Sequence, residues 1–120
     1  MRSNLITLDI AKQLKHMGFK KIRFGAESGS NRMLEILNKQ TTVEQHQIAI
    51  DIANKIGLPI SASFMHDLPG ETDQDKKMTL DFINRNKGKL QVEDWYKYQA
   101  FPGTRFYNNE NPLTQNMRVR

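Results

Sequence analysis

The sequence predicts an α/β fold in which parallel strands alternate with helices, as a partial (half) β/α barrel of the TIM-barrel-like kind. Segments with helical and strand periodicity alternate along the chain, and helices of this length favour parallel pairing through right-handed crossovers. The expected strands are apolar on one face and polar or small on the other. A doubly wound sheet buries both faces, so this pattern favours a barrel whose lumen is open to a ligand.

Each expected helix begins at a residue able to cap it. Apolar residues spaced by three predict the first helix, and Gly18 ends it. Thr42 with Gln45 has the spacing of a capping box, and Thr72 with Asp75 resembles a second capped start. The expected helices are Asn4–Met17 with Ser3 as N-cap, Asn31–Leu37 with Ser30 as N-cap, one from Thr42 to near Ile56-Gly57, and one from Thr72 to about Asn86.

Three strands are expected between these helices, at Lys20–Glu27, Leu58–Met65 and Glu93–Phe101. Successive side chains of a strand point to opposite faces, so the first two strands each divide into an apolar and a polar set. The apolar face is expected to hold Ile22, Phe24, Ala26, Ile60, Ala62 and Phe64. The opposite face is expected to hold Arg23, Gly25, Glu27, Ser61, Ser63 and Met65.

A chain of 120 residues is long enough for one domain and too short for two. We assign residues 1–107 to the partial barrel, and residues 108–120, which are polar and show no period, to an irregular tail. No apolar run approaches the roughly 20 residues of a membrane helix, and the first ten residues lack the regions of a signal peptide. A cytoplasmic protein without a membrane partner is therefore expected.

The charged residues and the absence of cysteine exclude several classes of function. The net charge is +5, but the basic residues are scattered rather than gathered in a stripe with aromatic residues. A solvated basic surface is therefore favoured over a nucleic-acid partner. The chain contains no cysteine, which excludes a disulfide framework, a thiolate zinc site and a cysteine-ligated iron–sulfur cluster within it.

Functional groups of β/α barrels lie at the carboxyl ends of the strands and in the loops that follow. In this sequence those places are Phe24–Ser30, Phe64–Thr72 and Tyr98–Thr104, and all three combine glycine with polar side chains. The three histidines do not cluster, and the adjacent His66 and Asp67 point in different directions, so no metal site is expected. Hydrolase, NTPase and dehydrogenase signatures are absent.

Four motifs over about residues 2–107 resemble the fourth to sixth strands of radical S-adenosylmethionine (radical SAM) enzymes. The resemblance is closest to the cobalamin-associated branch, which includes anaerobic Mg-protoporphyrin IX monomethyl ester cyclases. Each motif alone is weak, but the four stand in the family's order and spacing. The motifs are Gly25-Ala26-Glu27-Ser28, then Leu34 to Lys39 before Thr41-Thr42, then Leu68-Pro69-Gly70-Glu71-Thr72, and finally Pro102-Gly103-Thr104.

The resemblance implies a larger parent protein. The first unit of such barrels carries a Cys-x-x-x-Cys-x-x-Cys loop for a [4Fe–4S] cluster that binds and cleaves S-adenosylmethionine, and this chain lacks it. We therefore expect a fragment of a radical SAM oxidoreductase or transferase, inactive alone, whose partner is the rest of its own parent chain. S-adenosylmethionine and the cluster are then cofactors of the parent, with cobalamin possible through another domain.

The same resemblance assigns four cofactor-binding residues and no catalytic residue. Glu27 occupies the position at the end of the fourth strand that hydrogen-bonds the ribose hydroxyls of S-adenosylmethionine, and a carboxylate is a good acceptor for a vicinal diol. Ser63 and Met65 match positions where the fifth strand packs against the adenosyl group. Phe101 stands where the sixth strand meets the adenine.

Three of the four assignments have a structural alternative. Glu27 could cap the helix that follows Ser30 or pair with Arg23, while Met65 and Phe101 could be ordinary core residues. Asp67 departs from the family pattern, which has glycine before Leu-Pro-Gly-Glu. Its β-carbon could block a close backbone approach, or its carboxylate could cap the next helix.

An alternative function is a stand-alone β/α module that binds a protein, a sugar or RNA. If the chain is a fragment, Lys20–Glu27 becomes an edge strand beside apolar surface made for absent helices. We then predict a homo-oligomer formed through this edge or through the helix Asn4–Met17.

Overall fold

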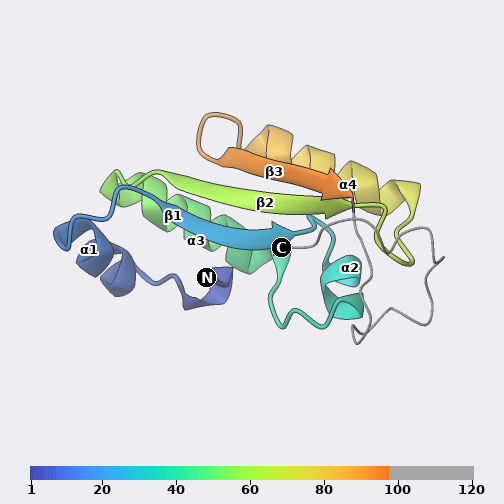
Figure 1. Cartoon of the computed structure of the whole chain (residues 1–120), viewed down its shortest axis with the longest axis horizontal. Helices are drawn as coiled ribbons and strands as arrows, with labels where there is room; N and C mark the ends of the chain where they lie inside the picture. The colour runs from blue at the N-terminus through green and yellow to red at the C-terminus, as the bar shows by residue number, and fades with distance from the viewer. Residues whose placement is uncertain (98–120) are drawn as a thin grey trace.

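A computed structural model describes residues 1–97. Three parallel strands form one sheet in the order β1-β2-β3, namely β1 Ile22–Glu27, β2 Ile60–His66 and β3 Gln91–Lys97. Helices precede and separate them along the chain, so the expected α/β fold with alternating parallel strands is confirmed. The helical elements are η1 Ser3–Leu5, α1 Leu8–His16, α2 Asn31–Ile36, α3 Val43–Ile56 and α4 Asp73–Arg85. Figure 1 shows α3 and α4 running behind the three strands.

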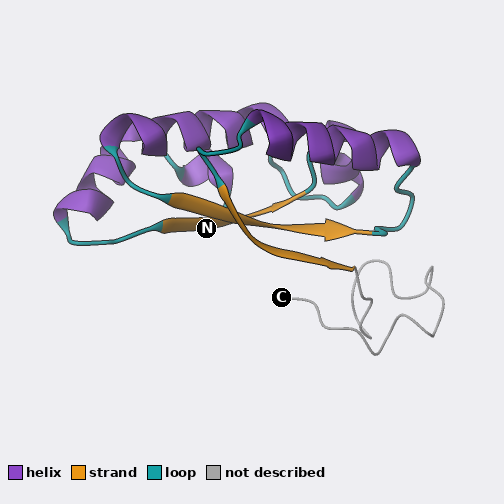
Figure 2. Cartoon of the chain, turned by 90° about the horizontal axis from the view of Figure 1, so that it is seen from above, coloured by secondary structure: helices purple, strands orange, loops and turns teal. Residues whose placement is uncertain are grey.

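The core lies between the sheet and the helices on one of its faces. All the residues predicted for the apolar face of β1 and β2 are at most 3% exposed, and they pack with Ile50 and Ala53 of α3 and Phe82 of α4. Figure 2 shows these helices above the strands, and within residues 1–97 it shows no helix beneath them. The predicted alternation in β1 and β2 therefore gives a sheet with one covered and one open face.

The capping signals of three helices are confirmed. Ser30 accepts the N–H of Met33 at the start of α2, at a distance of 3.4 Å. Thr42 and Gln45 form a capping box at the start of α3, and Thr72 and Asp75 form one at α4. These interactions satisfy N–H groups that have no partner within their own helix.

The first helix was predicted wrongly. The segment Asn4–Met17 divides into η1 and α1, and the N-cap of α1 is Thr7, whose hydroxyl accepts the N–H of Ile10 at 3.2 Å. Ser3 cannot cap because its hydroxyl is buried against His46. The break also lets Ile6 reach the core, where it is 4% exposed.

The ends of the chain's strands differ modestly from the prediction. β1 and β2 each begin two residues later than expected, and β3 begins two residues earlier, at Gln91. Residues 98–120, which include the expected end of the third strand and the tail, lie outside the described residues. In the described part of the chain, no helix combines the length and the apolar character that a membrane crossing requires.

Among residues 1–97, strand β1 is an edge of the sheet, and exposed apolar side chains lie on the segment before it. Leu5, Ile10, Met17 and Phe19 are between 37% and 68% exposed, and they precede β1 in the sequence. An unpaired edge next to apolar surface is prone to association with another chain. Self-association through this region stays a prediction.

Candidate functional site

A hollow lies toward the carboxyl ends of β1 and β2 and reaches the open face of the sheet. Its volume is about 560 Å³, within the roughly 300–1,000 Å³ of ordinary ligand pockets. Arg23, Gly25, Glu27 and Ser63, which were predicted for the polar face, line it together with Phe24 and Tyr96. The chain before α1 and after α2 supplies the walls. The lining residues are Met1, Arg2, Leu5, Arg23, Phe24, Gly25, Glu27, Lys39, Thr41, Ser63 and Tyr96.

Among residues 1–97, Glu27 is the only carboxylate that lines this hollow, where three cationic side chains also lie. Its side chain is 8% exposed, and Lys39 Nζ lies 3.5 Å from its Oε2 atom. The alternative that Glu27 caps the next helix is wrong, because the Ser30 side chain is the N-cap of α2. Arg23 Nε lies 3.5 Å from Glu93 on β3. A buried carboxylate beside a cation is therefore the main polar feature of the hollow.

Ser63 and Gly25 lie beside each other on the open face, because the register pairs them across β1 and β2. A β-carbon on Gly25 would lie 3.3 Å from Glu27 Oε1, closer than most real contacts. Glycine at position 25 therefore leaves enough space for the Glu27 carboxylate. Of the four predicted site residues, the structure brings Glu27 and Ser63 together at the hollow.

Met65 does not join them in the described structure. Met65 is 4% exposed and belongs to a second apolar cluster with Met33 of α2 and Leu68, so it fills space beneath α2 and does not line the hollow. Met65 is therefore a core residue, which is the structural alternative given for it above. Phe101 lies outside the described residues.

Asp67, which stands where the family pattern has glycine, adopts a left-handed backbone with φ of 57°. Glycine adopts this conformation without steric cost, which explains the pattern. The Asp67 carboxylate does not cap α4, where Thr72 is the N-cap. It accepts a hydrogen bond from Lys76 Nζ at 2.7 Å, and this bond, ahead of the contact with His66, holds the pKa of Asp67 below its ordinary value.

The segment after Glu27 packs unusually close to α4. A β-carbon on Gly29 would lie 2.6 Å from the Cα atom of Thr79 and 3.0 Å from the carbonyl oxygen of Met78, so only glycine fits there. The Gly29 N–H donates to the Thr79 hydroxyl at 2.9 Å. This contact spans 50 residues, and the sequence motif Gly-Ser contains no signal for it.

Asp75 also binds the segment after Glu27, through hydrogen bonds of its side chain. Its Oδ1 atom accepts a hydrogen bond from the Ser30 hydroxyl at 2.8 Å. Its Oδ2 atom accepts hydrogen bonds from the N–H and the hydroxyl of Thr72, each at 2.9 Å, and also forms an ion pair with Arg32. Burial raises the pKa of Asp75, but the bonds from Thr72 and Ser30 outweigh it and hold the pKa below its ordinary value. The sequence predicted Asp75 only as half of a cap.

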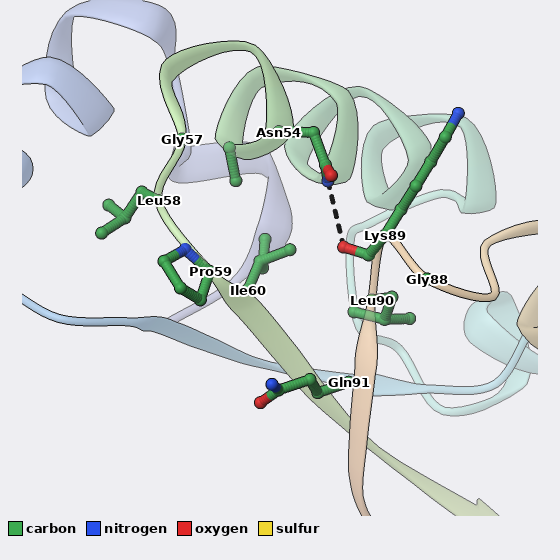
Figure 3. A pocket seen from close by; sticks show the side chains of 10 residues that line it. Asn54, Gly57, Leu58, Pro59, Ile60, Gly88, Lys89, Leu90 and Gln91 are labelled. Atoms are coloured by element: carbon green, nitrogen blue, oxygen red, sulfur yellow. Dashed lines mark hydrogen bonds between the residues drawn. The ribbon is translucent and has the colours of Figure 1, made fainter.

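A second hollow of about 550 Å³ lies at the opposite end of the sheet, where β2 and β3 begin (Figure 3). The chain before each strand forms its wall, and Asn54 Nδ2 donates to the carbonyl oxygen of Lys89 at 3.0 Å. In β/α barrels this end of the strands contributes to stability, and the carboxyl end carries function. The hollow beside Glu27 is therefore the candidate site.

Metal binding has no support among residues 1–97. No group of three or more His, Cys, Asp and Glu side chains is close enough there to hold an ion. The whole chain lacks cysteine, so its residues do not fit a [4Fe–4S] cluster. The hollow does fit part of an organic cofactor, since it joins a carboxylate acceptor to cationic donors in a space of suitable size.

Comparison with known proteins identifies the family. The family model that describes the sequences of the radical SAM superfamily matches residues 1–83 of this chain. This chain belongs to the radical SAM superfamily, whose members use S-adenosylmethionine and a [4Fe–4S] cluster. The resemblance seen in the sequence is thereby confirmed at the level of the superfamily, whereas its assignment to the cobalamin-associated branch stays a prediction.

Two relatives and one solved structure show the extent of the similarity. The chain is 33% identical to an uncharacterized methyltransferase of Pyrococcus horikoshii, covering 98% of this chain and 26% of that protein. It is 33% identical to a tRNA-2-methylthio-N(6)-dimethylallyladenosine synthase of Rickettsia rickettsii, covering 87% of this chain and 23% of that protein. The fold matches coproporphyrinogen III oxidase of Escherichia coli, a radical SAM enzyme, with a TM-score of 0.71 at 16% identity, covering 97% and 28%. The chain thus spans about a quarter of these proteins' length.

Proposed function

We propose that this chain forms part of the S-adenosylmethionine pocket of a radical SAM enzyme, with Glu27 accepting hydrogen bonds from the ribose hydroxyls. The observation that carries the proposal is the buried Glu27 carboxylate at the end of β1, in a hollow on the open face of the sheet. Ionised carboxylates accept hydrogen bonds strongly, and the two oxygens of one carboxylate match the two hydroxyls of a vicinal diol.

The charges of the hollow suit the rest of the cofactor. S-adenosylmethionine carries an amino-acid carboxylate, and Arg2, Arg23 and Lys39 line the hollow. Lys39 is placed to hold that carboxylate, because its ammonium group already lies beside Glu27 and its side chain is 41% exposed. Ser63 would offer its hydroxyl to the adenosyl group from β2. Bound here, the cofactor would supply a 5′-deoxyadenosyl radical once a cluster elsewhere reduces it.

The reductive step requires residues that this chain lacks. Three thiolates hold the cluster in this family, and the chain has no cysteine. We therefore propose that the chain is inactive alone and acts with a cysteine-bearing part of a longer protein. Methyltransferase and methylthiotransferase relatives favour a transferase as that protein over a cyclase.

Replacement of Glu27 tests the proposed pocket. Glu27→Ala is expected to weaken the binding of S-adenosylmethionine at least about tenfold, because hydrogen bonds to a charged group contribute roughly 1.5–3 kcal/mol. Isothermal titration calorimetry on the full chain gives the dissociation constants. Asp81→Ala is the control, since Asp81 lies on α4 outside the hollow and its side chain is 61% exposed. Equal affinity in wild type and Glu27→Ala, or no binding by the wild type, would contradict the pocket and favour a stand-alone module with another ligand.

Cluster reconstitution tests the second half of the proposal. The purified chain, incubated with iron and sulfide under reducing conditions, is expected to show no stoichiometric [4Fe–4S] absorbance, and no cleavage of S-adenosylmethionine with a reductant. A relative that contains the cysteine loop is the positive control. A stoichiometric cluster on this chain would overturn the assignment of the cluster to another part of the protein.

A further inference from the structure

A buried histidine of α3 contacts the backbone that leads into Glu27. His46 is 0% exposed and lies between two aromatic rings of the core, with ring centroids 5.3 Å from Phe24 and 6.3 Å from Phe82. Its Nε2 atom is 3.0 Å from the carbonyl oxygen of Ala26, and its Nδ1 atom is 2.6 Å from the Ser3 hydroxyl. The proposed function gives this residue no role.

The surroundings of His46 determine its protonation. Burial lowers the pKa of His46 to about 4, although its hydrogen bond to Ala26 and the charge of Glu44 act in the opposite direction. The ring is therefore neutral near pH 7 and carries one N–H. A carbonyl oxygen only accepts, so the proton is on Nε2 and points at Ala26. Nδ1 is then the acceptor, and the Ser3 hydroxyl donates to it.

The carbonyl oxygen of Ala26 receives a second hydrogen bond. The N–H of Ser28 donates to it at 2.7 Å, which closes a three-residue turn centred on Glu27. Glu27 has a φ of 65°, so the turn has the rare and strained hand of the γ-turn. A residue other than glycine keeps such a conformation only where its surroundings hold it.

We propose that His46 is a positioning residue for Glu27, because its Nε2–H holds the Ala26 carbonyl oxygen in the turn that directs the Glu27 carboxylate into the hollow. Ser3 lies on the other side of the ring, where its hydroxyl contacts Nδ1 and does not contact the turn. The inference rests on the proposed role of Glu27 as the ligand group. It concerns the geometry of the turn, however, which can be measured without a ligand.

Three variants separate the effect of losing the Nε2–H donor from the effect of changing the size of the side chain. His46→Phe keeps an aromatic ring in the core and removes the donor, whereas His46→Gln places an amide N–H near the position of Nε2. Ser3→Ala is the matched control, since it removes the other hydrogen bond of the ring and leaves the contact with Ala26 in place. The full chain is used throughout.

Hydrogen exchange and ligand titration then give the readouts. We expect the Ser28 amide to exchange at least about tenfold faster in His46→Phe than in wild type, His46→Gln or Ser3→Ala, after normalisation to the Ile50 amide of α3. S-adenosylmethionine is expected to bind His46→Phe about tenfold more weakly, with His46→Gln within about threefold of wild type.

The outcomes distinguish this inference from the proposed pocket. If no variant binds S-adenosylmethionine, including the wild type, the pocket fails, and the exchange of Ser28 still decides the role of His46 in the turn. Unchanged exchange at Ser28 in His46→Phe would overturn the inference. If His46→Phe does not fold, ¹⁵N NMR of the wild-type imidazole decides: protonated Nε2 is expected, and protonated Nδ1 would overturn the proposal.

Discussion

Asp75→Ala is expected to lower the free energy of unfolding by about 3 kcal/mol, because it removes the acceptor of the buried Ser30 hydroxyl and of two donors of Thr72 at once. Ser30 and Thr72 would each lose a partner in a site where Asp75 itself is 3% exposed. Urea unfolding followed by circular dichroism measures the change. Because Ser30 follows Glu27 by three residues, the loss should also weaken ligand binding at the hollow.

Two variants show which part of the network matters. Arg32→Ala removes the half-exposed end of the ion pair, and pairs of this kind contribute at most about 1 kcal/mol. Asp75→Asn keeps the shape and one acceptor oxygen, so its effect should lie between the other two. A loss below about 1 kcal/mol in Asp75→Ala would mean that the segment after Glu27 is held by the Gly29 contact alone.

Acidification is expected to destabilise the chain already at pH values well above those at which carboxylates usually titrate. The pKa of His46 is about 4 in the folded state against 6.5 for the unfolded residue, so the unfolded chain takes up its proton first. The contribution of neutral His46 is complete above pH 6.5 and is lost as the pH falls toward 4. The loss over that window is about 3 kcal/mol, of which about 2 kcal/mol falls between pH 7 and 5.

The comparison variant His46→Gln isolates this effect. Carboxylates with lowered pKa, such as Asp75 and Glu44, lose their stabilising contribution only as the pH falls through and below their ordinary values. Burial raises the pKa of Glu71, which acts in the opposite direction, but both proteins contain Glu71. Urea unfolding at pH 7, 6 and 5 should show a fall in wild type that is absent in His46→Gln. Parallel curves for the two proteins would contradict a neutral, buried His46.

Elements with local signals could be predicted from the sequence. Period-two alternation in β1 and β2 correctly predicted the face that packs into the core, and Ser30, Thr42 and Thr72 were correctly predicted as N-caps. The position of Glu27 at the end of β1, and of Ser63 beside Gly25, also agrees with the prediction. These features depend on side chains that are a few residues apart, or on the parallel register of two neighbouring strands.

The errors share a different cause. Ser3 has the right chemistry and position for a cap, but its hydroxyl bonds to His46, 43 residues away. Met65 has the right alternation for the open face, but α2 folds against it and closes it into a second cluster. In both cases packing between distant segments overrode a local pattern, and no spacing rule within one segment contains that information.

The sequence alone determined the class of this protein: the alternating strands, the capped helices and the four motifs led to the radical SAM superfamily, and the absence of cysteine excluded a cysteine-ligated cluster within this chain. The tertiary structure decided how the candidate site is built. Only the fold brings His46 to the Ala26 carbonyl, Gly29 against Thr79 and Asp75 to Ser30, because each contact joins segments that lie 20 to 50 residues apart. The first of these contacts reaches the turn at Glu27, whose strained backbone depends on its surroundings.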